Sequence, residues 1–355
     1  MNSTSKGKTQ SAKLTAIGLA SLLSLVGCGS RTIRVDLVPT ESRLKQETIE
    51  SADASAFTAD KVALITVSGL IANAHKGGVL SAGQNPVSDF RETLDAIAKD
   101  PSVKAVLLRI NSPGGTVTAS DMMYKDLLAF KKKTGKPVVV CMMDVCASGG
   151  YYLSCAADYR VAYPTTITAS IGVIIETINI NGTLKKIGVA TESVKSAQNK
   201  DMGSPFKPAL DADKPLSDND RELLQNIVNQ FYAGFQDVVK ASPQTIKPEN
   251  WKMVTDGRVV TGKDALALGL IDEVGNLDSA IEKAKALAHI AKAKVVTYTR
   301  SEEGIGSIYA TAPTPAPSSA AQPTVNMLNI NVDLNDLVPR GQAYYLWEGF
   351  GSGSE

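Results

Sequence analysis

Three short apolar runs, separated by segments with a helical hydrophobic pattern, constrain the fold of this chain most strongly. The runs cover residues 62–67, 105–110 and 138–143 and are rich in valine, isoleucine and leucine. Such runs are typical of strands that are buried on both faces of a sheet. Apolar residues recur at helical spacing within 87–98 and 119–130. The alternation of strand and helix predicts an α/β domain.

The second half of the chain extends this domain. Ser217, followed by Asp218 and Asp220, resembles a helix start, and the apolar residues from Leu223 to Val239 form one wide stripe. We expect this stripe to be buried in the core or in a subunit interface. A final helix over 277–290 and a strand over 295–298 close the domain near residue 300. With 43% hydrophobic residues among 355, the chain can bury a substantial core.

The N-terminus has the pattern of an export signal. Three lysines precede an apolar stretch over 14–27, which is too short to span a hydrocarbon core of ~30 Å as a helix. It therefore predicts a signal peptide. The stretch ends in small residues before Cys28, which resembles a bacterial lipoprotein signal, in which that cysteine is lipidated. The alternative is an ordinary signal peptide that contains a cysteine.

Composition divides the chain into five parts. We predict a lipoprotein signal peptide over 1–27, a polar membrane-proximal stalk over 28–59 and the α/β domain over 60–300. Four prolines lie between Thr311 and Thr324, which favours a linker over 301–325. In the remaining tail, 326–355, the aromatic segment 342–347 is expected to dock on another surface.

Charge and residue counts exclude several classes of function. The formal net charge is +1, so a nucleic-acid partner is not expected. Only two histidines, His75 and His289, are present, which argues against a metal site and against a histidine-based triad. The three cysteines beyond Cys28, at positions 141, 146 and 155, lack the spacing of a redox or zinc motif. We interpret them as buried packing residues, with one disulfide as the alternative.

Two glycine-containing turns follow predicted buried strands. The first, Asn-Ser-Pro-Gly-Gly at 111–115, lacks the lysine of a phosphate-binding loop. In the second, Ala-Ser-Gly-Gly-Tyr-Tyr at 147–152, Ser148 lies where a strand turns into a helix, and the neighbouring N–H groups can stabilise an oxyanion. Together they favour a serine nucleophile. Its base would be a desolvated lysine, and spacing leaves Lys195, Lys200 and Lys207 as candidates.

These turns, with Thr-Ala-Ser-Ile-Gly-Val at 168–173 and Asn-Lys-Asp-Met-Gly-Ser-Pro at 199–205, resemble the signal peptide peptidase A group of serine proteases, peptidase family S49 in its short form. The resemblance covers about residues 60–300. It implies a domain similar to Clp protease and crotonase, built of stacked strand-strand-helix units. It also implies Ser148 as nucleophile, Lys200 as general base, Ser170 as a hydroxyl that orients the lysine, and the N–H groups of Gly115 and Gly149 as the oxyanion hole.

The resemblance implies an endopeptidase with a Ser-Lys dyad, without cofactor, that degrades signal peptides or other hydrophobic unfolded peptides. It further implies a ring-shaped homo-oligomer in which neighbouring chains share active sites. With a lipid on Cys28, the catalytic domain would lie outside the cytoplasm on a bacterial membrane. The alternatives are a crotonase-type acyl-CoA enzyme, which the export signal disfavours, and a non-catalytic scaffold, which would not require Ser148 and Lys200 together.

Overall fold

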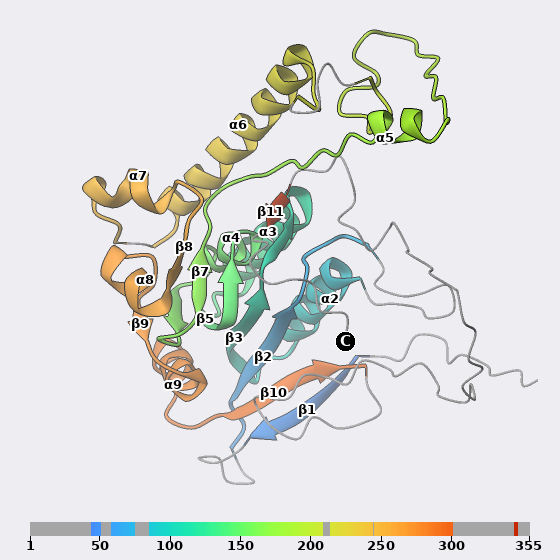
Figure 1. Ribbon diagram of the computed structural model, residues 1–355. Helices are drawn as coiled ribbons and strands as arrows, with labels where there is room; N and C mark the ends of the chain where they lie inside the picture. Colours follow the sequence, from blue (N-terminus) through green and yellow to red (C-terminus); the bar gives the residue numbers. More distant parts are fainter. Residues whose placement is uncertain are drawn as a thin grey trace, which may run out of the picture. The chain divides into compact units, whose positions relative to one another are not determined.

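The computed structural model describes residues 44–50, 58–74, 85–208, 214–243, 245–300 and 344–346. Its centre is a twisted sheet in which neighbouring strands run parallel, except at the β1 edge and where β8 pairs with β7 (Figure 1). The main path of the sheet is β1 (Lys45–Glu50), β10 (Lys294–Thr299), β2 (Lys61–Ser68), β3 (Val103–Ser112), β5 (Val138–Ala147), β6 (Tyr159–Ala162) and β9 (Glu273–Val274). The predicted α/β fold class is confirmed.

The apolar runs are continuous because both faces of the sheet are covered. Ala63 and Ile65 of β2 belong to one core cluster, whereas Val62 and Leu64 belong to the other. The first cluster is completed by α2 (Pro86–Lys99), α3 (Val117–Thr134) and α4 (Gly149–Ser154), and the second by α9 (Leu277–Leu287). Alternate side chains of each strand point to opposite faces, so nearly every position in these runs is apolar, with Thr66 and Arg109 as the exceptions.

The remaining elements are short, and two of them, β7 and β8, belong to the same sheet off its main path. They are β4 (Gly114–Thr116), β7 (Ile167–Ala169), α5 (Asn181–Lys186), η1 (Pro248–Asn250), α7 (Trp251–Val254), β8 (Val259–Thr261), α8 (Gly262–Leu268) and β11 (Tyr344–Leu346). β7 pairs with the end of β5 and with β8. β11 pairs antiparallel with β4.

The long helix α6 (Asp218–Ala241) begins as predicted. The side chain of its N-cap, Ser217, accepts a hydrogen bond of 3.1 Å from the backbone of Asp220. Only the C-terminal part of the apolar stripe, at Phe235 and Val239, is buried. Phe231 is 36% exposed, so the N-terminal half of the stripe still presents apolar surface in the single chain.

Part of the segment expected to form the stalk belongs to the sheet. Residues 45–50 form the edge strand β1, and Ile49 packs against the core cluster on the α9 side. Residues 189–196 form no strand, and all of them are exposed.

The signal peptide, Cys28 and the 301–325 linker lie outside the described residues, as does most of the tail. In the part of the chain that the structure describes, no helix has both the length and the apolar character needed to cross a membrane.

Candidate active site

Ser148 occupies a strained turn between β5 and α4. Its backbone dihedrals are φ 52° and ψ −113°, a region that non-glycine residues rarely adopt and that costs about 1–3 kcal/mol. The residue is 1% exposed, and its hydroxyl oxygen has no hydrogen-bond partner among the described residues. A strained residue with a buried, unsatisfied hydroxyl contributes unfavourably to stability, which is typical of a functional site.

A second strained turn lies directly beside Ser148. Residues Cys146 and Ala147 pair in parallel register with Thr168 and Ala169, so the turns that follow the two strands are neighbours. Ser170, the next residue after β7, also has a positive φ, of 52°, and is 7% exposed. The structure thus brings the Ser148 and Ser170 turns together.

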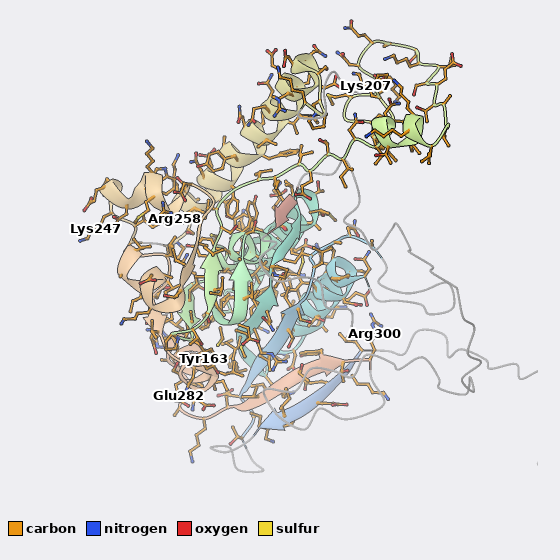
Figure 2. The ribbon with its side chains drawn as sticks, viewed as in Figure 1. Tyr163, Lys207, Lys247, Arg258, Glu282 and Arg300 are labelled. Carbon is orange, nitrogen blue, oxygen red and sulfur yellow. The ribbon has the colours of Figure 1, made fainter. Side chains whose placement is uncertain are left out.

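The Ser170 turn is held from its other side by the segment before β8. The backbone N–H of Ser170 donates a 2.8 Å hydrogen bond to the carbonyl of Arg258, whose guanidinium forms an ion pair with Asp256. This bond fixes the Ser170 backbone between the nucleophile turn and the loop before β8. Figure 2 shows where Arg258 lies in the chain.

The first glycine turn adjoins the same place. Ser112 pairs with Cys146, and a Cβ on Gly150 would lie 3.0 Å from the Ser112 carbonyl oxygen. The two glycine turns therefore approach each other so closely that only glycine fits at position 150 without displacement of a neighbour.

Gly115 is held against residue Ile71. Thr116 N–H donates to the Ile71 carbonyl at 2.9 Å, and Ile71 N–H donates to the Gly114 carbonyl at 2.8 Å. A Cβ on Gly115 would lie 1.9 Å from the Ile71 oxygen. Since successive residues of a strand direct their backbone groups to opposite edges, the N–H and C=O of Gly115 point away from Ile71, toward the edge of β4 that pairs with β11.

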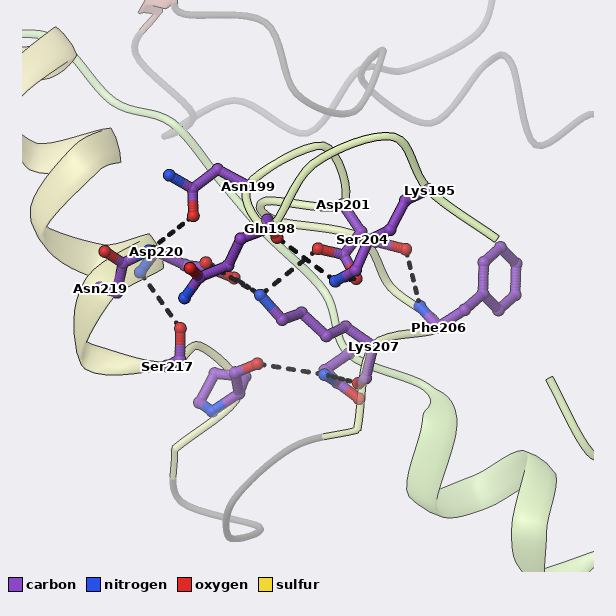
Figure 3. A network of polar contacts seen from close by, with 12 residues as sticks. Lys195, Gln198, Asn199, Asp201, Ser204, Phe206, Lys207, Ser217, Asn219 and Asp220 are labelled. Carbon is purple, nitrogen blue, oxygen red and sulfur yellow. Dashed lines mark hydrogen bonds and ion pairs between the residues drawn. The ribbon is translucent and has the colours of Figure 1, made fainter. Parts of the chain in front are cut away.

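The three candidate lysines lie on one loop between α5 and α6. Figure 3 shows Lys195 and Lys207 of this loop, with Lys207 bonded to Asp220 at the start of α6. Lys195 forms a 2.6 Å ion pair with Asp201, and Lys207 forms one of 2.7 Å with Asp220. Lys200 is exposed. Within the described residues, no hydrogen bond joins Lys200 to Ser148, so the chain by itself does not assemble the predicted dyad.

The Lys207–Asp220 pair attaches this loop to α6. Sequence reasoning predicted the helix start at Ser217 but not this ion pair. Asp220 is 1% exposed. Burial alone would raise its pKa, but hydrogen bonding to Lys207 and the charge of Lys207 outweigh burial and lower it. The hydrogen bond to Asp220 raises the pKa of Lys207. Both groups are therefore charged at neutral pH.

A cleft of about 530 Å³ begins at Ser170 and runs toward α6. Its lining combines apolar side chains with polar ones, and includes Ile171, Val173, Ile174, Val228, Asn229 and Tyr232. An extended peptide with apolar side chains fits a cleft of this chemistry.

The three cysteines are packing residues. Cys141, Cys146 and Cys155 are free and buried, as the main interpretation of their spacing expected. Burial raises the pKa of Cys141 to about 12 and that of Cys155 to about 11. Because a thiolate is the reactive form, these thiols do not compete with Ser148 as nucleophile.

Comparison with known proteins agrees with this arrangement. A model of peptidase family S49 matches residues 130–291. The chain is 35% identical over 221 residues to a protein of Methanocaldococcus jannaschii provisionally named a protease, covering 62% of this chain and 68% of that protein. It is 32% identical over 267 residues to a protein of Enterococcus faecium provisionally named signal peptide peptidase SppA, covering 75% of this chain and 74% of that one.

Among solved structures, the mutant 1510-N membrane-bound stomatin-specific protease in complex with a substrate peptide matches with a TM-score of 0.40 and 15% identity, covering 64% of this chain and 81% of that chain. The sequence matches, and not the structural match, establish the family. The residues that the family model matches, 130–291, include the Ser148 turn, the Ser170 turn and the lysine loop. The chain belongs to peptidase family S49 and is a serine protease of the signal peptide peptidase type.

Proposed function

We propose that Ser148 is the nucleophile of an endopeptidase whose general base, Lys200, comes from a neighbouring copy of the chain. The observation that carries the proposal is the Ser148 hydroxyl: buried, without a hydrogen-bond partner and held on a strained turn. A hydroxyl kept in this state at a cost in stability is available to react with a substrate and to bond a base that arrives from outside the chain.

The oxyanion hole would be formed by the N–H groups of Gly149 and Gly115. Gly149 is the first residue of α4, so its N–H has no partner within that helix. The N–H of Gly115 faces away from Ile71, as the bonds of Ile71 to both neighbours of Gly115 require. Two preorganised donors of this kind, near one nucleophile, would stabilise the oxygen of a tetrahedral intermediate.

Lys200 is the best candidate for the base among the three lysines. A base must be neutral when it takes a proton, and the hydrogen bond to Asp220 raises the pKa of Lys207. Lys195 is engaged in an ion pair of 2.6 Å with Asp201. Within the described residues, neither an ion pair nor a side-chain hydrogen bond involves Lys200. Its exposure in the single chain means that desolvation has to come from a second copy, which favours a shared site in a ring.

The surface that would close such a ring is available on α6. The stripe residues Leu224, Ile227 and Phe231 line a hollow of about 340 Å³ together with Met202 of the lysine loop. Burial of this surface against a neighbour would remove apolar area from water. It would also place the lysine loop at the subunit interface.

In the proposed reaction, Ser148 Oγ attacks the carbonyl carbon of the scissile peptide bond while the neutral Lys200 amine takes the hydroxyl proton. The tetrahedral intermediate collapses, the C–N bond breaks, and the leaving amine takes that proton back from Lys200. Water, deprotonated by Lys200, then hydrolyses the acyl-enzyme and regenerates Ser148. The hydroxyl of Ser170, next to the nucleophile turn, would orient the lysine amine.

The substrates we propose are hydrophobic unfolded peptides in the cell envelope, including released signal peptides, cut after small or apolar residues. The apolar part of the cleft beside Ser170 supports this preference. A lipid on Cys28 would hold the enzyme at a bacterial membrane, with the catalytic domain outside the cytoplasm, where such peptides appear.

A serine-reactive fluorophosphonate probe tests the nucleophile directly. The wild-type chain should be labelled at Ser148, and Ser148→Ala should not be labelled. Ser88→Ala is the control, since it removes an exposed serine hydroxyl on α2, away from the proposed site, and should still be labelled. Labelling of Ser148→Ala at the wild-type level would contradict the assignment.

A further inference from the structure

We propose that Asn111 is a positioning residue for the peptidase reaction: its side-chain amide fills an offset between β3 and β5 and so fixes the turn that carries Ser148 against the turn that carries Gly115. The proposal rests on the function proposed above and deepens it, since it concerns the same site. The resemblance to the family assigns a role to Gly115 of the Asn-Ser-Pro-Gly-Gly motif but none to Asn111.

The register between β3 and β5 is interrupted just before the site. Ile110 pairs with Met142 and Ser112 pairs with Cys146, so the single residue between the two positions of β3 lies opposite three residues of β5. Such a bulge leaves backbone groups of the longer strand without partners on the neighbouring strand. Because β5 leads directly into the nucleophile turn, the geometry of the bulge determines where Ser148 lies relative to the end of β3.

The Asn111 side chain takes the place of the missing backbone partner. Its Oδ1 accepts a 3.0 Å hydrogen bond from the backbone N–H of Val145, and its Nδ2 donates one of 3.4 Å to the Asp144 carboxylate. A side-chain amide offers the same kinds of acceptor and donor as a peptide group, so it can bridge the strands where the backbone cannot. Val145 is 8% exposed, and loss of the acceptor would leave its N–H unsatisfied and largely away from water.

The other edge of the same β5 segment is held by two threonine hydroxyls. Thr166 donates to the Met143 carbonyl at 2.6 Å, and Thr168 donates to the Cys146 carbonyl at 2.7 Å. Both threonines are buried. Side chains therefore fix the segment before the nucleophile turn on both edges, and Asn111 supplies the contact on the β3 edge.

The residue after Asn111 holds the proposed oxyanion turn. The Ser112 hydroxyl donates a 2.7 Å hydrogen bond to the Gly69 carbonyl and accepts one of 3.1 Å from the N–H of Gly114. Two adjacent residues thus hold the two turns, one turn each. A shift at Asn111 would change the distance between the nucleophile and the N–H of Gly115, and a misplacement of about 1 Å can lower a rate by about 100-fold.

Asn111→Ala is the first test. The variant removes the acceptor of the Val145 N–H but no group that faces the substrate cleft. We expect kcat for an apolar peptide to fall by about 10- to 100-fold while KM stays within about 2-fold of wild type. The rate constant for fluorophosphonate labelling of Ser148 should fall by a similar factor.

Asn85→Ala is the matched control for a loss of stability. The Asn85 side chain accepts hydrogen bonds from the backbone N–H groups of Val87 and Ser88 at the start of α2, so its removal also leaves backbone donors without their acceptor. With both variants compared at equal concentrations of folded protein, measured by urea unfolding, Asn85→Ala should retain the wild-type kcat.

Exchange of the two polar side chains at positions 111 and 144 tests the contact itself. Asn111→Asp keeps an acceptor for the Val145 N–H but sets a second carboxylate beside Asp144, and we expect the repulsion to lower kcat by about 3- to 10-fold. Asp144→Asn keeps an oxygen that can accept from Asn111 and should remain within about 2-fold of wild type. The double variant Asn111→Asp, Asp144→Asn has one donor and one acceptor in exchanged positions, so its kcat should recover to within about 2-fold of wild type.

The outcomes separate this inference from the proposed function. If Asn111→Ala is labelled and turns over peptide at the wild-type rate while Ser148→Ala is inert, the nucleophile assignment stands and the positioning role is wrong. A loss of kcat in Asn111→Ala no larger than that in Asn85→Ala, or a double variant no faster than Asn111→Asp, also overturns the role. If the wild-type chain is not labelled at Ser148, the proposed function fails, and the positioning role fails with it.

Discussion

The amide of Ser148 donates a 2.7 Å hydrogen bond to the carbonyl of Ala169 and so ties the nucleophile turn to the turn that carries Ser170. Both Ser148 and Ala169 have positive φ values, of 52° and 71°. Two strained, non-glycine residues joined by one short bond indicate that the position of the Ser148 hydroxyl is maintained at the expense of stability.

This relationship predicts that loss of activity at Ser148 is accompanied by a gain in stability. Ser148→Ala removes a buried hydroxyl without a partner, and Ser148→Gly additionally relieves the backbone strain. We expect both to be inactive, with Ser148→Gly more stable than Ser148→Ala by about 1 kcal/mol. Urea unfolding measures the difference. Equal or lower stability of the glycine variant would show that the turn is not strained.

Gly115 is predicted to be intolerant of any side chain. A Cβ there would lie 1.9 Å from the Ile71 oxygen, whereas nothing lies within 4 Å of a Cβ on Gly182 in α5. We expect Gly115→Ala to displace β4, to lower the unfolding free energy by about 1–3 kcal/mol and to abolish peptidase activity. Gly182→Ala, the matched control, should leave both unchanged or raise stability slightly. Wild-type activity in Gly115→Ala would remove β4 from the proposed site.

The buried Lys207–Asp220 pair is predicted to hold the lysine loop. Lys207→Met leaves the Asp220 carboxylate without its cation at a site that is 1% exposed, which costs about 1–3 kcal/mol. Hydrogen exchange over 195–207 should become faster, and kcat should fall because Lys200 lies on this loop. Lys195→Met breaks the more exposed pair with Asp201 and should have the smaller effect on exchange.

The Lys207–Asp220 pair also predicts the pH range in which the loop over 195–207 is most protected from exchange. The pKa of Asp220 is lowered on folding, so its contribution is lost as pH falls below the usual carboxyl range of ~4. The pKa of Lys207 is raised, so its contribution is complete below the usual lysine value of ~10.4 and is lost as pH rises through the folded pKa. The protection factor over 195–207, which is the exchange rate corrected for the intrinsic rate at each pH, should be greatest between these limits. A window absent in wild type or retained in Lys207→Met would contradict the assignment.

Asp100 is predicted to contribute to acid stability at the β1 edge. Burial raises its pKa, but hydrogen bonds from Gln46 and Lys61 outweigh this and lower the pKa to about 2. Stability from this group is present above the unfolded pKa of ~3.9 and is lost as pH falls toward 2, a contribution of about 1–2 kcal/mol.

Asp100→Asn provides the comparison, because asparagine can still accept the bond from the Ser102 N–H. The stability difference between wild type and Asp100→Asn should be constant above about pH 5 and should shrink between about pH 4 and pH 2. A difference that does not change with pH would show that the carboxylate charge is not the source of the stabilisation.

A mixing experiment tests the shared dyad. If Ser148→Ala and Lys200→Ala chains are unfolded together and reassembled one to one, a shared site should recover about a quarter of wild-type activity, because half the serines are intact and half of their neighbours bring a lysine. Neither variant alone should be active. If the mixture forms rings of normal size but has no activity, either Ser148 and Lys200 act within one chain or Lys200 is not the base.

The sequence by itself determined the buried strands, the helices between them, the turn that carries Ser148 and the start of α6 at Ser217. These follow from local patterns: uninterrupted apolar runs, helical spacing, glycines after a strand and a capping side chain. The family motifs also lie within short segments, so the resemblance could be recognised without coordinates.

Only the tertiary structure decided which segments meet across long separations. Two strand pairings depend on partners far away in sequence: that of β11 with β4 and that of residues 45–50 with β10. The fold of a long loop decides that Lys195 and Lys207 form ion pairs while Lys200 stays exposed. The strain at Ser148 is likewise imposed by the strands that hold its turn. A pattern in one sequence indicates the conformational preference of a short segment. Strand pairing and the desolvation of a side chain depend on the residues that the fold brings next to it.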